Sequence, residues 1–165
     1  MDLFVLGVCL YLILVFMGIR LIVPYYGFTT PEVPKQIPAF LAKEVTSIKN
    51  ASFSKEHFLR SAFQLLVDRY YGGRWETLVY ANRAFEPIGR RESGFIPCNI
   101  FNHLMRTILV ASGEFSNDEI KTVVVPLNFF IHQYLKVRIG DRWIDIDPTY
   151  HRLGIPYGKH AIWFA

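Results

Sequence analysis

The chain has 165 residues, 52% of them apolar and 19% charged, with a formal net charge of +4. This length suits one domain with an appendage and is too short for two ordinary domains. Lys and Arg are scattered except at Arg90 and Arg91, so we expect no nucleic-acid partner, and two cysteines, Cys9 and Cys98, are too few for a disulfide framework.

The N-terminus is the first predicted element. Residues 3–19 are apolar and uncharged, and roughly 20 such residues cross a bilayer core, so we predict one transmembrane helix and assign residues 1–26 to a membrane anchor. Asp2 replaces the basic start of a signal peptide and no small-residue cleavage site follows closely, which favours an uncleaved single-pass anchor in contact with membrane lipid. The lack of a polar face disfavours a buried core helix. Arg20 and Lys35 favour a cytoplasmic domain only slightly, so the side of the membrane stays open.

A linker and then a domain follow the anchor. Three prolines within residues 29–38 indicate an extended segment, and we place a Pro-rich linker at residues 27–39 and the globular domain at residues 40–165. Within the domain, apolar residues recur at helical spacing in two stretches, one after the N-cap candidate Ser54 and one from Pro97.

Strands are expected in the C-terminal part of the domain. The β-branched side chains of residues 120–127 indicate a strand, and a hairpin with its turn at residues 140–141 follows. In that register Lys136 faces Asp145 as a cross-strand ion pair, and the aliphatic face of the hairpin is expected to be core. Helices followed by antiparallel strands predict an α+β fold, with helices packed on an antiparallel β-sheet.

Cys98 is the candidate nucleophile of the chain. It stands at the expected start of a helix, where unpaired backbone N–H groups and the helix dipole stabilise a thiolate. The simpler alternative is that Cys98 is one small buried apolar residue. A base close to the thiol is what would distinguish the two.

His132 is the candidate base, and Asp147 is the candidate acid that orients it. The hairpin register makes them diagonal neighbours, about 7 to 8 Å apart between Cα atoms, which long side chains can bridge. A carboxylate beside an imidazole sets its tautomer and stabilises the imidazolium, as a base that serves a thiol requires. The alternative is a polar hairpin face in water. The other histidines lack a zinc-like spacing, so we expect neither a metal nor another cofactor.

Three motifs in this order resemble the transglutaminase-like superfamily: PCNIFNHLMRTILVASG with Cys98, HQYLKV with His132 and GDRWIDIDPTY with Asp147. The resemblance covers about residues 55–165 and implies a papain-like core with a Cys-His-Asp triad. It implies that the cysteine attacks an amide or ester carbonyl, that the histidine moves the proton, and that the aspartate orients the imidazole. Water or an amine would then resolve a thioester acyl-enzyme.

The implied enzyme is a cysteine protease or acyltransferase whose substrate is a protein or peptide with peptide or isopeptide amide bonds. Asn99 follows the cysteine where animal transglutaminases carry an aromatic residue, and no calcium-loop motif is recognisable. The second oxyanion donor stays open among Trp75, Gln64 and Tyr80. Two other functions also stay open: a non-catalytic peptide-binding module on the same fold, and an arylamine acetyltransferase type, for which nothing suggests a coenzyme A site.

Overall fold

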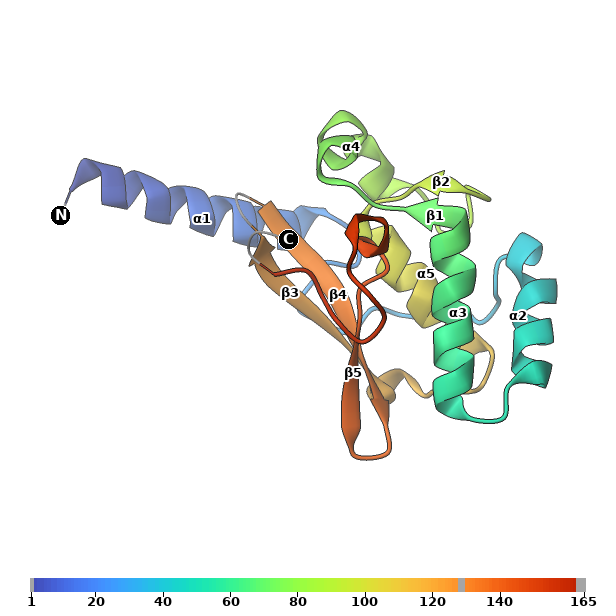
Figure 1. Ribbon diagram of the computed structural model, residues 1–165. Helices are drawn as coiled ribbons and strands as arrows, with labels where there is room; N and C mark the ends of the chain where they lie inside the picture. Colours follow the sequence, from blue (N-terminus) through green and yellow to red (C-terminus); the bar gives the residue numbers. More distant parts are fainter. Residues whose placement is uncertain (1, 128–129, 163–165) are drawn as a thin grey trace.

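The computed structural model describes residues 2–127 and 130–162 of the chain, and its fold is mixed α+β (Figure 1). The elements in chain order are α1 (Leu3–Ile22), α2 (Ala39–Ala51), α3 (Lys55–Arg69), β1 (Tyr70–Tyr71), α4 (Arg74–Val79), β2 (Gly94–Phe95), α5 (Cys98–Ala111), β3 (Ile120–Leu127), β4 (Phe130–Ile139) and β5 (Arg142–Ile146). Short 3-10 helices lie at Ala81–Phe85, Asn117–Glu119 and His151–Leu153. The α+β class predicted from the sequence is confirmed.

The domain is built in layers. Strands β3, β4 and β5 form an antiparallel sheet in that order. An antiparallel sheet is what the sequence predicts. Helix α5 lies against the sheet, α3 packs on α5, and α2 packs on α3 (Figure 1). The short strands β1 and β2 pair in parallel and join the end of α3 to the segment before α5. Neither α2 nor this parallel pair is predicted by the sequence patterns.

Local signals explain where the two predicted helices begin. The Ser54 hydroxyl accepts a hydrogen bond from a backbone N–H of the first turn of α3 at 3.1 Å, which caps the helix. Pro97 precedes α5, where its restricted φ suits a helix start. Helix α3 ends at Arg69, and the two residues that follow it pair with β2.

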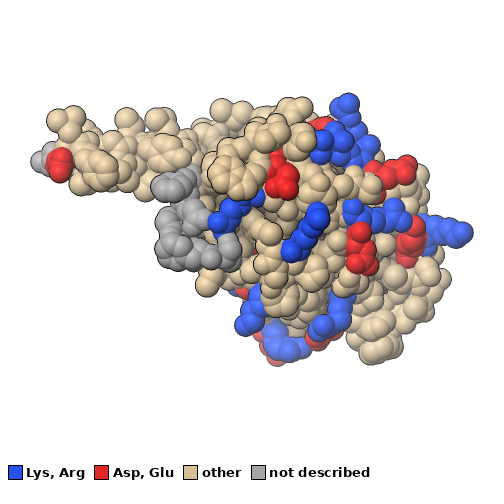
Figure 2. All heavy atoms as spheres, turned by 45° about the horizontal axis from the view of Figure 1, so that its top comes forward, with Lys and Arg blue, Asp and Glu red and all other residues tan. Residues whose placement is uncertain are grey.

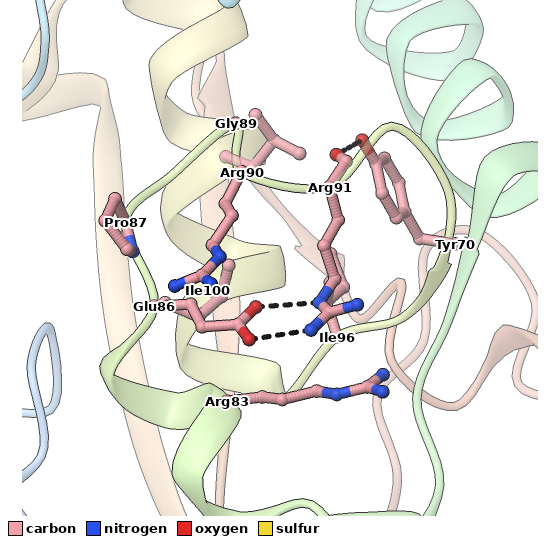
Figure 3. Close-up of a pocket in the computed structure, with 10 residues that line it drawn as sticks. Tyr70, Arg83, Glu86, Pro87, Gly89, Arg90, Arg91, Ile96 and Ile100 are labelled. Carbon is pink, nitrogen blue, oxygen red and sulfur yellow. Dashed lines mark hydrogen bonds and ion pairs between the residues drawn. The ribbon is translucent and has the colours of Figure 1, made fainter.

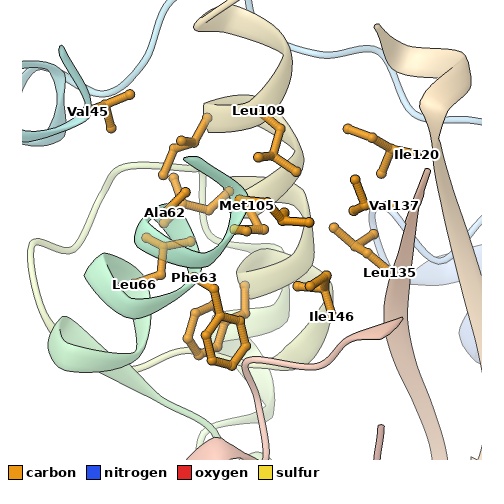
Figure 4. Packing of buried hydrophobic residues seen from close by; sticks show 14 of the residues in the cluster. Val45, Ala62, Phe63, Leu66, Met105, Leu109, Ile120, Leu135, Val137 and Ile146 are labelled. Carbon is orange, nitrogen blue, oxygen red and sulfur yellow. The ribbon is translucent and has the colours of Figure 1, made fainter. Parts of the chain in front are cut away.

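Helix α5 forms the centre of the hydrophobic core (Figure 4). Its side chains are buried along almost its whole length. Phe63 and Leu66 of α3 lie on one side of the helix, and Leu135 and Val137 of β4 lie on the other (Figure 4). A close-packed interior has low compressibility, so α5 cannot shift easily relative to the sheet. The first residue of α5 is therefore held in a defined position beside β4.

The hairpin of β4 and β5 has the predicted register. Lys136 faces Asp145 in the sheet, and Lys136 Nζ lies 2.8 Å from Asp145 Oδ1, so the predicted ion pair is confirmed. The aliphatic face of the hairpin joins the core, also as predicted. The alternative expectation is that the polar face of the hairpin lies in water. At one end of the hairpin it does not, because His132 and Asp147 are buried there.

The loop before β2 is held by one ion pair (Figure 3). Arg91 Nε and Nη2 each donate to a carboxylate oxygen of Glu86 at 2.7 Å, and the Tyr70 hydroxyl donates to the Arg91 carbonyl oxygen at 2.7 Å. The hydrogen bonds from Arg91 lower the pKa of the Glu86 carboxyl group. The cavity beside them has a volume of only about 10 Å³, which is room for one water at most. The two adjacent arginines of the sequence therefore lie in a structural loop.

Helix α1 projects from the domain (Figure 1). It has 20 residues, its most apolar window has a mean hydropathy of 2.5, and none of its residues is buried. On the face shown in Figure 2, the projecting helix carries charged atoms only at its free end. Helix α1 is thus long and apolar enough to cross a membrane, a property that it shares with signal sequences.

The chain turns sharply after α1 and enters the domain. Tyr25 has a left-handed φ of 65°, an unusual conformation for a bulky residue. Its ring stacks on His103 with 3.8 Å between centroids, and its carbonyl oxygen accepts a hydrogen bond from Gln133 Nε2 at 2.7 Å. Arg20 donates two further hydrogen bonds to carbonyl oxygens of the turn, each at 3.2 Å. These contacts hold the residues after the helix against α5 and β4.

Candidate active site

The structure brings Cys98, His132 and Asp147 together from three elements. Cys98 is the first residue of α5, His132 lies in β4, and Asp147 directly follows β5. His132 Nε2 lies 2.7 Å from Asp147 Oδ2, and both residues are only 1% exposed, so this end of the hairpin is no water-facing surface. Cys98 and His132 line the same pocket, and because Asp147 occupies Nε2 of the imidazole, Nδ1 is the nitrogen that is left to interact with the thiol.

Two neighbours hold the imidazole and its carboxylate partner in place. The Ala161 N–H donates to Asp147 Oδ2 at 2.9 Å, the same oxygen that meets the imidazole. The Tyr150 ring packs edge-on against His132 with 4.7 Å between centroids. The other carboxylate oxygen, Oδ1, is buried and has no hydrogen-bond partner among the described residues. The orientation of His132 is therefore set by one hydrogen bond and one ring contact, both shielded from water.

The charges at the site favour an ion pair between the thiol and the imidazole. Burial by itself raises the pKa of Cys98, but the hydrogen bond and charge of His132, helped by a hydrogen bond from Tyr26, bring that pKa below its ordinary value. Burial by itself lowers the pKa of His132, but the charge and hydrogen bond of Asp147, helped by Cys98, raise it to about 9. Both shifts favour a thiolate that faces an imidazolium, and the thiolate is the nucleophilic form of cysteine.

Tyr26 belongs to the site although no pattern in the sequence reveals it. Its hydroxyl lies 2.6 Å from Cys98 Sγ, and the residue is 5% exposed. Burial, followed by the charge of Cys98, raises the pKa of Tyr26 well above its usual value. The phenol therefore keeps its proton, and its O–H donates the hydrogen bond to the sulfur. Because Tyr26 precedes Cys98 by 72 positions, only the fold joins the two residues.

Side chains next to the nucleophile and the base hold the turn that carries Tyr26. Asn99 Nδ2 donates to the Pro24 carbonyl oxygen at 3.0 Å, and Gln133 Nε2 donates to the Tyr25 carbonyl oxygen at 2.7 Å. The Asn99 amide therefore serves to hold this turn. The chain that leaves α1 is thus one wall of the site.

Cys98 and His132 border a small pocket of about 50 Å³. Tyr26 and Tyr150 supply aromatic walls, and Arg74 supplies a positive charge. Such a volume admits only a few atoms of a ligand beside the thiol.

The thiol and the base line the pocket, and the acid that orients the base lies on the other side of the imidazole; these are the three groups used in acyl transfer by cysteine. No family model, curated protein or solved structure matches this chain. The chemistry of the pocket is therefore inferred from its own geometry.

The upstream residues considered for a second oxyanion donor lie outside the pocket. Trp75 is 77% exposed on α4, and the Gln64 amide donates to Asp68 on the surface of α3 at 2.7 Å. Tyr80 is 40% exposed beside Phe95. None of the three candidates lines the pocket of the thiol.

The remaining histidines have structural partners. Burial, with a smaller effect of the Arg106 charge, lowers the pKa of His103 to about 4, so its ring is neutral where it stacks on Tyr25. His160 Nδ1 lies 2.7 Å from Asp145 Oδ2, the carboxylate already paired across the hairpin. Among the described residues, no group of three His, Cys, Asp or Glu side chains is placed to hold a metal ion.

Proposed function

We propose that this protein is a membrane-anchored cysteine protease or acyltransferase of the transglutaminase-like type, with a papain-like core, that acts on peptide or isopeptide amide bonds. The observation that carries the proposal is the buried relay from Cys98 through His132 to Asp147, with the thiol at a helix N-terminus. The lowered thiol pKa and the raised imidazole pKa support it, because active sites shift nucleophile and base in these directions. The length and hydropathy of α1 support the membrane anchor.

The proposed reaction begins when the Cys98 thiolate adds to the substrate carbonyl. The His132 imidazolium gives its proton to the leaving nitrogen, the C–N bond breaks, and the acyl group stays on sulfur as a thioester. Water or an amine then attacks the thioester, His132 takes up the proton, and the thiolate is restored. The Cys98 backbone N–H has no partner within α5 and would donate to the oxyanion, and the Tyr26 hydroxyl, 2.6 Å from the sulfur, is the candidate for the second donor.

The alternative is a non-catalytic peptide-binding module on the same fold. A binding pocket has no need of an activated thiol, and burial of ionisable groups costs free energy even when the groups are paired. This cost favours catalysis over binding alone.

Labelling with iodoacetamide across pH tests the catalytic proposal on the full-length chain in lipid nanodiscs. We expect Cys98 to label below pH 8.5, about the pKa of a free thiol, because His132 and Tyr26 lower the pKa of its thiol. Cys9 in α1 serves as a thiol outside the site. His132→Ala should move the labelling midpoint of Cys98 upward by about one pH unit or more, because burial then raises the thiol pKa with less opposition.

Asp147→Asn is the second variant, because it keeps the size of the side chain and removes the charge that raises the His132 pKa. We expect its labelling midpoint to move in the same direction as that of His132→Ala. Circular dichroism identifies which variants fold. If Cys98 labels in the native chain with the pH profile of a free thiol, and with the same profile in a folded variant, the catalytic proposal fails and the binding module is favoured.

A further inference from the structure

A second cavity, of about 400 Å³, lies between α1 and the sheet. Five side chains of α1 within residues 12–17 form one wall, and Pro126, Phe130 and Ile131 of β3 and β4 form the other. Every one of these side chains is apolar. The volume is that of a small-molecule site, and apolar cavities hold hydrocarbon in preference to water.

Two residues connect this cavity with the pocket of the thiol. Phe130 and Ile131 line both spaces, and Ile131 directly precedes His132 in β4. Phe130 remains 41% exposed, so part of its ring is free to contact a ligand. A ligand in the apolar cavity would therefore lie against the same two residues that line the pocket of the thiol.

The helix that forms the cavity wall indicates what can enter it. In the proposed anchor, residues 12–17 of α1 lie in the bilayer, so the cavity opens among lipid chains. A polar peptide would lose its hydration there without gaining partners, because the walls offer no hydrogen-bonding side chain. A hydrocarbon chain would enter from similar surroundings and contact apolar walls on two sides.

We propose that this cavity is an acyl-chain subsite, and that the substrate of Cys98 is a lipid-modified peptide whose aliphatic chain occupies it. This inference rests on the proposed function and adds the class of substrate. The amide carbonyl near the lipid would lie beside Phe130 and Ile131, within reach of the thiolate. Addition of sulfur to that carbonyl breaks the C–N bond, the nitrogen leaves with the proton of His132, and the acyl group remains as a thioester.

Alkylating reagents of different chain length test the subsite in the full-length chain in nanodiscs at neutral pH. The reagents are iodoacetamide and N-dodecyl iodoacetamide, and the rate at Cys98 is divided by the rate at Cys9, which corrects for partition of the long reagent into the bilayer. We expect the dodecyl chain to raise this ratio about tenfold or more, because burial of its methylene groups favours binding.

Val15→Trp and Leu14→Trp are the matched variants. Val15 lines the cavity, so a tryptophan there should remove most of the gain from the dodecyl chain. Leu14 is its neighbour in α1, is 63% exposed and does not line the cavity, so the same change there should keep the gain. Iodoacetamide itself should label Cys98 equally fast in both variants.

The outcomes separate the two proposals. If iodoacetamide finds Cys98 no more reactive than a free thiol, the proposed function fails and the subsite falls with it. If iodoacetamide labels Cys98 rapidly but the dodecyl chain raises labelling of Cys9 and Cys98 equally, the proposed function stands and ordinary bilayer lipid fills the cavity. An equal gain in Val15→Trp and Leu14→Trp would also overturn the subsite.

Discussion

At the scale of single residues, Tyr26 combines two effects on the thiol of Cys98. Its hydroxyl donates a hydrogen bond to the sulfur, which stabilises the thiolate. The same hydroxyl covers the sulfur, so an incoming carbonyl has to share or replace this hydrogen bond. Because burial raises the pKa of Tyr26 and keeps the phenol protonated, the donor is present over the whole pH range of interest.

The change Tyr26→Phe should raise the pKa of Cys98. It removes the hydroxyl and keeps the ring in its place, and a hydrogen bond to a charged group contributes about 1.5–3 kcal/mol. At about 1.4 kcal/mol per unit, we expect the midpoint of iodoacetamide labelling to move upward by roughly 1–2 pH units.

Tyr25→Phe is the control for this prediction. Tyr25 carries the same side chain one position earlier, but its ring stacks on His103 and not on the thiol. Its variant should label with the native midpoint. Equal midpoints in Tyr26→Phe and the native chain would show that the hydroxyl does not stabilise the thiolate.

At the scale of elements, a close contact between the chain after β1 and the chain after β5 positions Asp147. The Gly72 N–H donates to the Thr149 carbonyl oxygen at 3.2 Å. A Cβ atom at Gly72 would lie 2.2 Å from Thr149 Cγ2 and 2.7 Å from the Thr149 carbonyl oxygen. Since the segment that begins with Asp147 passes through this contact, the absence of a side chain at Gly72 matters for the site.

Gly72→Ala should destabilise the protein by about 1–3 kcal/mol, the usual cost of forcing atoms into a packed interior. Thermal unfolding followed by circular dichroism should show a fall in Tm of roughly 2–4 °C per kcal/mol for a chain of this size. Gly27→Ala is the matched control, because a Cβ at Gly27 meets no atom within 4 Å. The prediction is wrong if both variants unfold at the same temperature.

At the scale of the whole molecule, the turn that connects α1 to the domain also forms part of the site. Arg20 at the end of α1 donates to the turn that carries Tyr26, and side chains beside the nucleophile and the base hold the same turn. Displacement of α1 relative to the domain would therefore move a group that contacts the thiol. This arrangement favours an anchor that stays attached over a helix that is removed.

We predict that the chain stays in the membrane fraction at its full mass after an alkaline carbonate wash. Leu10→Arg combined with Leu14→Arg should release it, because an arginine near the centre of a membrane helix costs about 2.5–3.5 kcal/mol. Phe53→Arg, which places the charge on an 85% exposed residue of the domain, should leave the chain in the membrane. A shorter, soluble chain that begins after α1 would instead identify α1 as a cleaved signal sequence.

The elements that could be predicted from the sequence are those decided by interactions between residues close together in the chain. The register of β4 and β5 could be predicted because a tight turn and the alternation of side chains decide it within one short stretch. Helix α3 could be predicted from its cap and its periodicity. Helix α2 could not, because it buries only Leu41 and Val45, too few for a clear apolar face, and it depends on α3 for its contacts.

The sequence by itself determined the apolar N-terminal helix, the order of α3, α5 and the three antiparallel strands, and the choice of Cys98, His132 and Asp147 as candidates. These conclusions depend on composition, periodicity and short motifs, which are properties of neighbouring residues. Only the tertiary structure decided that Tyr26 meets the thiol, that the polar end of the hairpin is buried, and that an apolar cavity adjoins the site. The physical reason is that burial and contacts between distant segments shift pKa values and shape cavities, and neither quantity exists until the chain has folded.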